Sequence, residues 1–141
     1  MKMLVPVDDS EVSLRALDWA AALQRESTPI AVELLNVRPP AEHYGAASAL
    51  DHAAVERALR EAQQRVLARA LHHAAGAGLQ QLAAHAVQGL PAEAIVEAAR
   101  AHGVDQIVMS THGRGAVGAF FLGSVAQRVA HLAPMPVTLV K

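Results

Sequence analysis

A glycine-rich segment near the C-terminal end has the residue types and the setting of a phosphate-binding loop. It follows an apolar run that predicts a strand, precedes a helical pattern, and reads Ser-Thr-His-Gly-Arg-Gly-Ala-Val-Gly-Ala-Phe-Phe-Leu-Gly-Ser over residues 110–124. Glycines let successive main-chain N–H groups approach one anion closely. Gly123 and Ser124 come at the start of the helix, where the helix dipole favours negative charge. The segment predicts a phosphate site; the alternative is a tight strand-to-helix connection without a ligand.

The same segment is poor in groups that catalyse hydrolysis. Arg114 is its one formally charged residue, so recognition would depend on main-chain amides more than on cationic side chains. It contains no carboxylate that could act as a general base or hold a metal ion. We therefore expect a bound nucleotide to be retained, with slow hydrolysis or none. Any Mg²⁺ would arrive on the phosphates, with Ser124 or Asp8 as outer contacts.

The eight histidines do not predict a metal site. His72 and His73 are adjacent, which points them in different directions from a helix, and the others lack the spacing of metal ligands. His112 lies in the glycine-rich segment, where it is either a phosphate contact or a solvated side chain. We expect no catalytic histidine and no metal held by protein ligands.

The composition excludes several classes of protein. Of 141 residues, 52% are hydrophobic and 18% are charged, which is far from the composition of a disordered chain. Twelve basic and 13 acidic residues give a net charge of −1, so no overall field attracts nucleic acid. The absence of cysteine excludes disulfides and thiolate chemistry. The apolar stretch 116–122 is too short to span a membrane. We expect one cytoplasmic domain over residues 1–141.

Strand and helix patterns alternate along the chain. Apolar runs predict the strands, and apolar residues three or four positions apart predict the helices. The expected strands are 3–7, 30–37 (with Glu33 inside it), 81–88, 104–109 and 137–141, and the expected helices run from Ser10 to before Pro29 and over 51–77, 92–101 and 124–132, with a loop at 38–50. This alternation predicts an α/β fold: an open, mainly parallel five-stranded sheet with helices on both faces, similar to a Rossmann fold.

Ligands of such sheets bind at the carboxyl ends of the strands, near the point where the strand order reverses. The residues that follow four of the expected strands are Asp8, Val37, Gly89 and the segment from Ser110. We expect these four to form one crevice. Asp8 has two possible roles here, as a ligand contact or as a cap of the first helix. For the capping role it competes with Asp9 and Ser10.

Two common nucleotide-binding motifs are absent, and a third pattern is present. The chain has no Gly-Lys-Ser/Thr of a Walker A loop, and the first strand ends in Asp-Asp-Ser, not in a glycine-rich turn. The stretches 4–11, 113–126 and 136–140 together resemble the universal stress protein family, and the match covers essentially the whole chain. Members that bind ATP share the pattern Gly-x-x-Gly-x9-Gly-Ser/Thr. Gly113, Gly123 and Ser124 match it with nine residues between the two glycines, while Ser110 replaces its first glycine.

The resemblance implies a sheet of the adenine nucleotide alpha hydrolase-like type that binds ATP. It places Asp8 near the ribose or adenine and the main chain of Val37 at the adenine edge. The nucleotide-binding residues that we expect are Pro6, Val7, Asp8, Val37, Met109, Ser110, His112, Gly113, Arg114, Gly115, Gly123, Ser124 and Val125.

The resemblance also implies a homodimer formed through the last strand, Pro136 to Lys141, which would lie at an edge of the sheet. The function expected is a stress-response module that binds ATP and regulates a partner. Two alternatives stay open: a nucleotide-free stress protein that acts through protein contacts, and a weak enzyme, either an ATP hydrolase or an adenine-nucleotide transferase.

Overall fold

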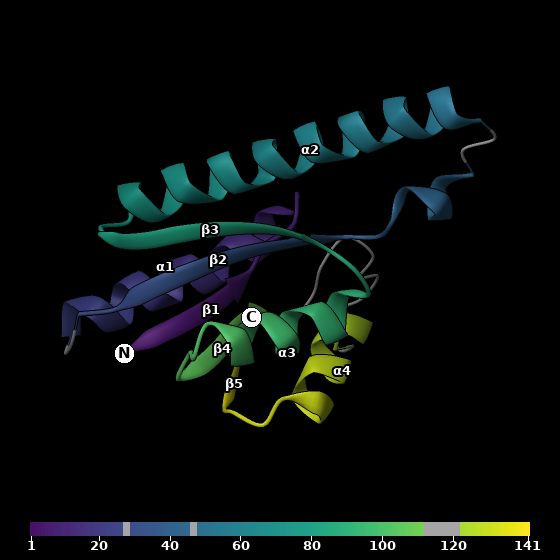
Figure 1. The fold of residues 1–141 in the computed structure, drawn as a ribbon. Helices are drawn as coiled ribbons and strands as arrows, with labels where there is room; N and C mark the ends of the chain where they lie inside the picture. The colour runs from purple at the N-terminus through teal and green to yellow at the C-terminus, as the bar shows by residue number, and fades with distance from the viewer. Residues whose placement is uncertain (27–28, 46–47, 112–121) are drawn as a thin grey trace.

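Five parallel strands form one sheet in the order β3-β2-β1-β4-β5 (Figure 1). The computed structural model describes residues 1–26, 29–45, 48–111 and 122–141. The strands are β1 (Lys2–Pro6), β2 (Ala31–Arg38), β3 (Gln81–Gln88), β4 (Gln106–Ser110) and β5 (Val137–Val140). The helices are α1 (Glu11–Glu26), the 3-10 turn η1 (Ala41–Tyr44), α2 (Ala49–Gly76), α3 (Pro91–Ala101) and α4 (Ser124–Leu132). The predicted α/β class with a five-stranded parallel sheet is confirmed.

Helices cover both faces of the sheet because successive strand residues point to opposite sides. Met3 and Val5 of β1 pack on the side of α1 and α2, whereas Leu4 between them packs on the side of α3 and α4. Figure 1 shows α2 lying along β3 and β2 on one side, with α3 and α4 on the other. The chain moves outward from β1 to β3 and then crosses to β4, so the strand order reverses between β1 and β4.

The predicted loop over residues 38–50 is wrong in part. Arg38 is the last residue of β2, η1 occupies residues 41–44, and α2 begins at Ala49, two residues before the expected start. The helix starts early because Ser48 is in the extended region (φ −137°, ψ 164°) and its side chain accepts the N–H of Asp51 at 3.1 Å. This is the ordinary hydrogen bond of a serine N-cap.

The fourth strand begins later than predicted, at Gln106 instead of Val104. Gly103 has a left-handed backbone (φ +59°), and the N–H of Val104 donates to the carbonyl of Ala99 at 3.2 Å. Val104 therefore completes the C-terminal end of α3 by satisfying a helix carbonyl before the strand can start.

Glu33, the acidic residue in β2, is buried on the sheet face covered by α3 and α4. Burial alone would raise the pKa of its carboxyl group. Hydrogen bonds from His85 and Lys2, together with their charges, outweigh burial and lower that pKa below its ordinary value. The fold accepts a carboxylate at this position because Lys2 and His85, which are both partly exposed, provide hydrogen bonds and compensating charge.

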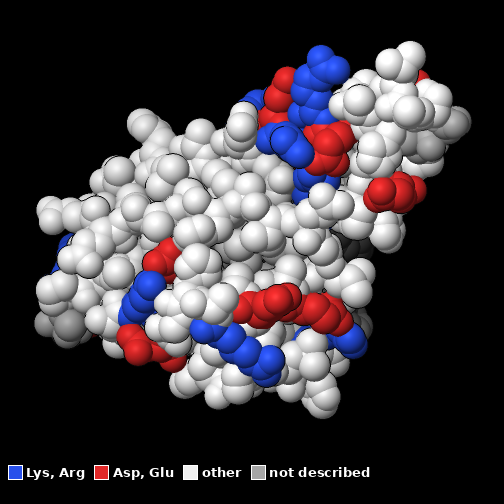
Figure 2. Space-filling view, viewed as in Figure 1, with Lys and Arg blue, Asp and Glu red and all other residues white. Residues whose placement is uncertain are grey.

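The charged side chains do not gather into a patch of one sign on the face drawn in Figure 2. Acidic and basic side chains are interspersed over α2 and over α3, with uncharged surface between the two helices. Within the described ranges, no helix combines the length and the apolar character required to cross a membrane.

Candidate functional site

A cavity of about 960 Å³ opens at the carboxyl ends of the strands, where the strand order reverses between β1 and β4. This volume is in the range of small-molecule sites. Nine of the predicted binding residues line it: Pro6, Val7, Asp8, Val37, Met109, Ser110, Gly123, Ser124 and Val125. The other four, His112, Gly113, Arg114 and Gly115, lie outside the described residues.

Gly89, which was expected in the crevice, does not line the cavity; Pro91, two residues later, does. The reason is that the main chain of Gly89 continues the pairing of β3 with β2. Its N–H donates to the carbonyl of Arg38 at 2.9 Å. Three of the four expected strand ends therefore meet at one site.

The amino end of α4 presents main-chain donors to the cavity. Gly123 is the N-cap residue, has an extended backbone (φ −60°, ψ 146°) and provides no side-chain cap. The first intrahelical bond of α4 runs from the N–H of Gln127 to the carbonyl of Gly123 at 2.9 Å. The N–H groups of residues 124–126 have no acceptor among the described residues. Such a helix end attracts an anion because its dipole and its unpaired N–H groups act together.

Hydrogen bonds fix the two described ends of the glycine-rich segment beside the sheet. The N–H of Thr111 donates to the carbonyl of Val140 at 2.9 Å, and the N–H of Gly123 donates to the carbonyl of Thr111 at 2.7 Å. Ser110 is buried at the end of β4, and no described residue other than glycine has a positive φ. Serine therefore causes no backbone strain at the position where the family pattern has its first glycine.

Asp8 organises the turn between β1 and α1. Its Oδ1 accepts the N–H of Ser10 at 2.9 Å and the hydroxyl of Ser10 at 2.5 Å. Ser10 Oγ in turn accepts the N–H of Ser13 at 3.2 Å, in the first turn of α1. Ser10 is thus the residue that caps the helix, and Asp8 holds Ser10 in place. The Oδ2 atom of Asp8 has no hydrogen-bond partner in the part of the chain that the structure describes.

The α2 wall of the cavity was not predicted from the sequence. Arg38 and Gln63 line the cavity and are both buried, and Arg38 Nε donates to Gln63 Oε1 at 2.9 Å. Gln63 Nε2 donates to the carbonyls of Asn36 at 3.1 Å and Val87 at 3.0 Å. Gln63 therefore ties α2 to both β2 and β3. The signal was present, because Gln63 is a polar residue on the apolar stripe of the predicted helix.

Glu56 of α2 supports this wall from outside the cavity lining. It pairs with the Arg38 guanidinium, and its Oε1 also accepts Arg60 Nε at 3.1 Å. Hydrogen bonds from Arg60 and from Arg38 hold the pKa of the Glu56 carboxyl below its ordinary value. The buried positive charge of Arg38 is therefore matched by a carboxylate that stays ionised at neutral pH.

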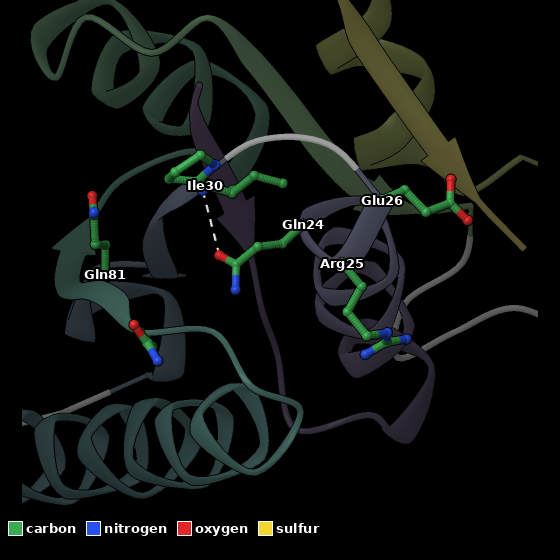
Figure 3. Close-up of a pocket in the computed structure, with 7 residues that line it drawn as sticks. Gln24, Arg25, Glu26, Ile30 and Gln81 are labelled. Carbon is green, nitrogen blue, oxygen red and sulfur yellow. Dashed lines mark hydrogen bonds between the residues drawn. The ribbon is translucent and has the colours of Figure 1, made fainter.

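A second, smaller cavity of about 390 Å³ lies at the opposite ends of β2 and β3 and has polar walls (Figure 3). Gln24 points across it to the main chain of Ile30, whose N–H donates to Gln24 Oε1 at 3.3 Å, while Glu26 points away. Gln24 Nε2 also donates to the carbonyl of Gly78 at 3.0 Å. The Gln24 side chain thus joins α1 to the segments before β2 and β3. The described residues that line this cavity do not bring reactive groups together.

Spacing along the chain predicted no metal ligands, but folding brings two histidines and a carboxylate together. Glu33, His85 and His102 come from β2, β3 and the residue after α3, and one ligand atom from each lies within 4.8 Å of the others. Linear spacing does not reveal this cluster, because three separate elements contribute one residue each. None of the three lines the 960 Å³ cavity.

The residues present fit an adenine nucleotide at the large cavity. The first amides of α4, which no other described residue accepts, suit phosphate oxygens, Asp8 Oδ2 can accept a ribose hydroxyl, and the end of β2 offers main-chain groups. These features define a doubly wound α/β protein with a large cavity at the switch point of its sheet, which is where proteins of this class bind ligands.

The sequence model of the Universal stress protein family matches residues 1–141, and the chain belongs to this family. The chain is 32% identical to universal stress protein MJ0531 of Methanocaldococcus jannaschii over 142 residues, covering 99% of this chain and 81% of that protein. A 55-residue stretch is 56% identical to a universal stress protein of Thermus aquaticus and covers 39% of this chain and 40% of that one.

Solved structures share the fold. Protein MJ0577 superposes with a TM-score of 0.82 at 28% identity, over 99% of this chain and 94% of that chain. A universal stress protein solved in complex with cAMP superposes with a TM-score of 0.68 at 25% identity, over 99% of this chain and 95% of that chain.

Proposed function

We propose that residues 1–141 act as one adenine-nucleotide-binding module, with ATP as the ligand. The observation that carries this proposal is the set of N–H groups at residues 124–126 that have no acceptor within the described ranges and that lie beside a cavity at the switch point of the sheet. A related structure of the same family holds cAMP, which supports an adenine ligand. Phosphates would bind at Gly123, Ser124 and Val125, and the ribose near Asp8.

Adenine would lie between the ends of β1 and β2. Val7 and Val37 line this part of the cavity, and Asn36 Nδ2 donates to the carbonyl of Val7 at 2.8 Å. This bond fixes the main chain around which the base would pack. Met109 and Pro6 add apolar surface, which suits the faces of a purine ring.

Bound ATP would be held with slow turnover or none. Asp8 would use Oδ1 for the turn with Ser10 and Oδ2 for a ribose hydroxyl, so neither of its oxygens is left to activate water as a general base. Mg²⁺ would enter with the phosphates and keep most of its water, with Ser124 or Asp8 as outer contacts. The module would signal its nucleotide state to a partner protein.

A homodimer formed through β5 is part of this proposal. β5 is an edge strand that pairs with β4 alone, and all its residues are half-buried. An apolar edge strand of this kind pairs readily with a second copy, which would hide its unpaired main-chain groups.

The test is mass spectrometry of the nucleotide released by denaturing the purified protein, followed by calorimetric titration of the emptied protein with ATP, AMP and cAMP. We expect an adenine nucleotide in the released fraction and binding at one site per chain. No released nucleotide and no heat at millimolar ATP with Mg²⁺ would contradict the proposal and favour a protein that acts through protein contacts. Phosphate release during the same incubation would identify the weak hydrolase.

A further inference from the structure

The cluster of Glu33, His85 and His102 lies away from the nucleotide cavity, on the sheet face covered by α3. Glu33 points to this face from β2, His85 does so from the neighbouring edge strand β3, and His102 caps the C-terminal end of α3. The side chains of His85 and His102 are 29% and 32% exposed, and that of Glu33 is 12% exposed. The cluster is therefore built into the fold and is still open to solvent on one side.

The ligand atoms converge on one point. Glu33 Oε2 lies 2.5 Å from His85 Nε2 and 3.9 Å from His102 Nδ1. The two imidazole rings lie side by side, with centroids 4.2 Å apart and planes inclined by 43°. Zinc bonds to imidazole nitrogen and carboxylate oxygen of about 2.0–2.2 Å place tetrahedral ligands about 3.3 Å from one another. The distance from Glu33 Oε2 to His85 Nε2 is shorter than this ligand separation and the distance to His102 Nδ1 is longer. Small rotations of the side chains bring both distances to it.

Lys2 orients the carboxylate. Its Nζ lies 3.0 Å from Glu33 Oε1 and donates to the carbonyl of His102 at 2.9 Å. Lys2 thus engages Oε1 and leaves Oε2 directed at the two histidines. A neighbour that fixes a ligating carboxylate is a common feature of metal sites. The ammonium charge opposes a cation, and it is balanced by Glu33 and by the C-terminal end of α3, where the helix dipole is negative.

We propose that Glu33 Oε2, His85 Nε2 and His102 Nδ1 bind one divalent transition-metal ion, of which Zn²⁺ is the best fit, with water at the fourth position. Two imidazoles and one carboxylate form a ligand set that prefers Zn²⁺, Cu²⁺ or Ni²⁺ to Mg²⁺ or Ca²⁺, which favour oxygen ligands alone. The site joins β2, β3 and α3, so a bound ion links the edge strand to the helix that follows it.

The chain offers a matched control for this proposal. His73 Nε2 lies 2.6 Å from Asp18 Oδ1, which joins α2 to α1. This pair has the same chemistry as His85 with Glu33 but has no second histidine among the metal-ligand groups found within the described residues. Substitution of His73 therefore measures the loss of one carboxylate-paired histidine without the loss of a three-ligand site.

The test is a Zn²⁺ titration of the full chain after treatment with a chelator, with His85→Gln, His102→Gln and His73→Gln in parallel. We expect one tight site per chain, a loss of affinity of at least about tenfold in His85→Gln and His102→Gln, and no change in His73→Gln. Equal affinity in all four proteins would overturn the proposal and leave the cluster as a hydrogen-bonded network. Loss of the site in His73→Gln alone would also overturn it.

A measurement on the unsubstituted protein avoids any effect of the variants on folding. In ¹⁵N spectra of the histidine side chains, we expect saturating Zn²⁺ to shift His85 Nε2 and His102 Nδ1 and to leave His73 unchanged. Shifts at the other histidines, with His85 and His102 unchanged, would refute the assignment. Nucleotide is omitted from the titration, so the result does not depend on whether the protein binds ATP.

Discussion

Ser110 stands where the expected nucleotide-binding pattern has its first glycine. It is buried at the end of β4. Its φ is not positive, since only glycines have a positive φ among the described residues. A serine therefore adopts this backbone without strain. If serine weakens binding at this position, the cause is therefore its side chain, which keeps the ligand away from the backbone. The same requirement for close contact between phosphate and backbone can be tested at Gly123.

Gly123→Val is expected to weaken nucleotide binding by at least about tenfold, which corresponds to about 1.4 kcal/mol. The backbone of Gly123 (φ −60°, ψ 146°) accepts valine, so the fold should persist. The added side chain lies on the cavity wall beside the amides of α4 and competes with phosphate for space. Calorimetric titration measures the effect. Gly123→Ala serves as the smaller step, and unchanged affinity in both variants would show that the amides of α4 do not hold the ligand.

Glu56→Gln is expected to remove a pH-dependent part of the stability. The pKa of Glu56 in the folded protein is lowered from 4.5 by hydrogen bonds from Arg60 and Arg38, so the carboxylate stabilises the fold above pH 4.5. This stabilisation is lost as the pH falls through the lowered pKa. Urea unfolding at neutral pH and at successively lower pH should show a difference from the unsubstituted protein that disappears in acid.

The control for this experiment is Glu61→Gln, an exposed glutamate on the same helix with no ion pair among the described residues. It should unfold like the unsubstituted protein at every pH. A difference for Glu56→Gln that is constant with pH would mean that the residue contributes through packing and not through its charge.

At the scale of elements, the contact of α2 with the sheet depends on one buried amide. Gln63→Leu leaves the carbonyls of Asn36 and Val87 and the Arg38 guanidinium each without one hydrogen-bond partner. Each unsatisfied buried group costs about 1–3 kcal/mol, so we expect a fall of at least about 2 kcal/mol in the free energy of unfolding. Urea titration measures it. Gln64→Leu, at the exposed neighbouring position, should change it little; a similar fall in both would contradict this role.

Edge strand β5 offers a test of the proposed dimer. The carbonyls of Pro136 and Val140 accept hydrogen bonds from Ile107 of β4 and from Thr111 directly after it, so the main-chain groups of Val137 and Leu139 between them point to the open edge. Leu139→Pro removes an open-edge N–H, whereas Leu139→Ala removes only side-chain packing. In sedimentation analysis we expect the unsubstituted protein and the alanine variant to be dimers and the proline variant a monomer. A dimeric proline variant would place the interface elsewhere.

Residue patterns were sufficient to predict each strand and α-helix that the described ranges contain, because each carries its own apolar period or its own stop signal. Boundaries were missed where one side chain decided them, as Ser48 does at the start of α2. The cavity residues that follow strands were predicted, because parallel strands bring their ends together. The α2 wall and the Glu33, His85 and His102 cluster were missed, because both depend on side-chain directions across several elements, which linear spacing does not contain.

At the scale of the whole molecule, the two proposed sites use separate parts of one sheet. Nucleotide would bind at the carboxyl ends of β1, β2 and β4, and the metal ion on the face beneath α3, with no residue in common. Each ligand stabilises the folded state by mass action, by about 2.7 kcal/mol at one hundred times its dissociation constant. Sites without shared residues are expected to contribute independently.

The buried guanidinium of Arg38 limits how a ligand can enter or leave. If α2 moved away from the sheet, Arg38 would lose its bonds to Gln63 and Glu56 together, and each hydrogen bond to a charged group is worth about 1.5–3 kcal/mol. We therefore expect α2 to be a rigid wall of the cavity, and the ligand to enter and leave on another side. At times too short for global unfolding, deuterium uptake by the amides of α2 should be the same in the empty and the nucleotide-saturated protein, and a difference at those times would mean that the helix opens locally.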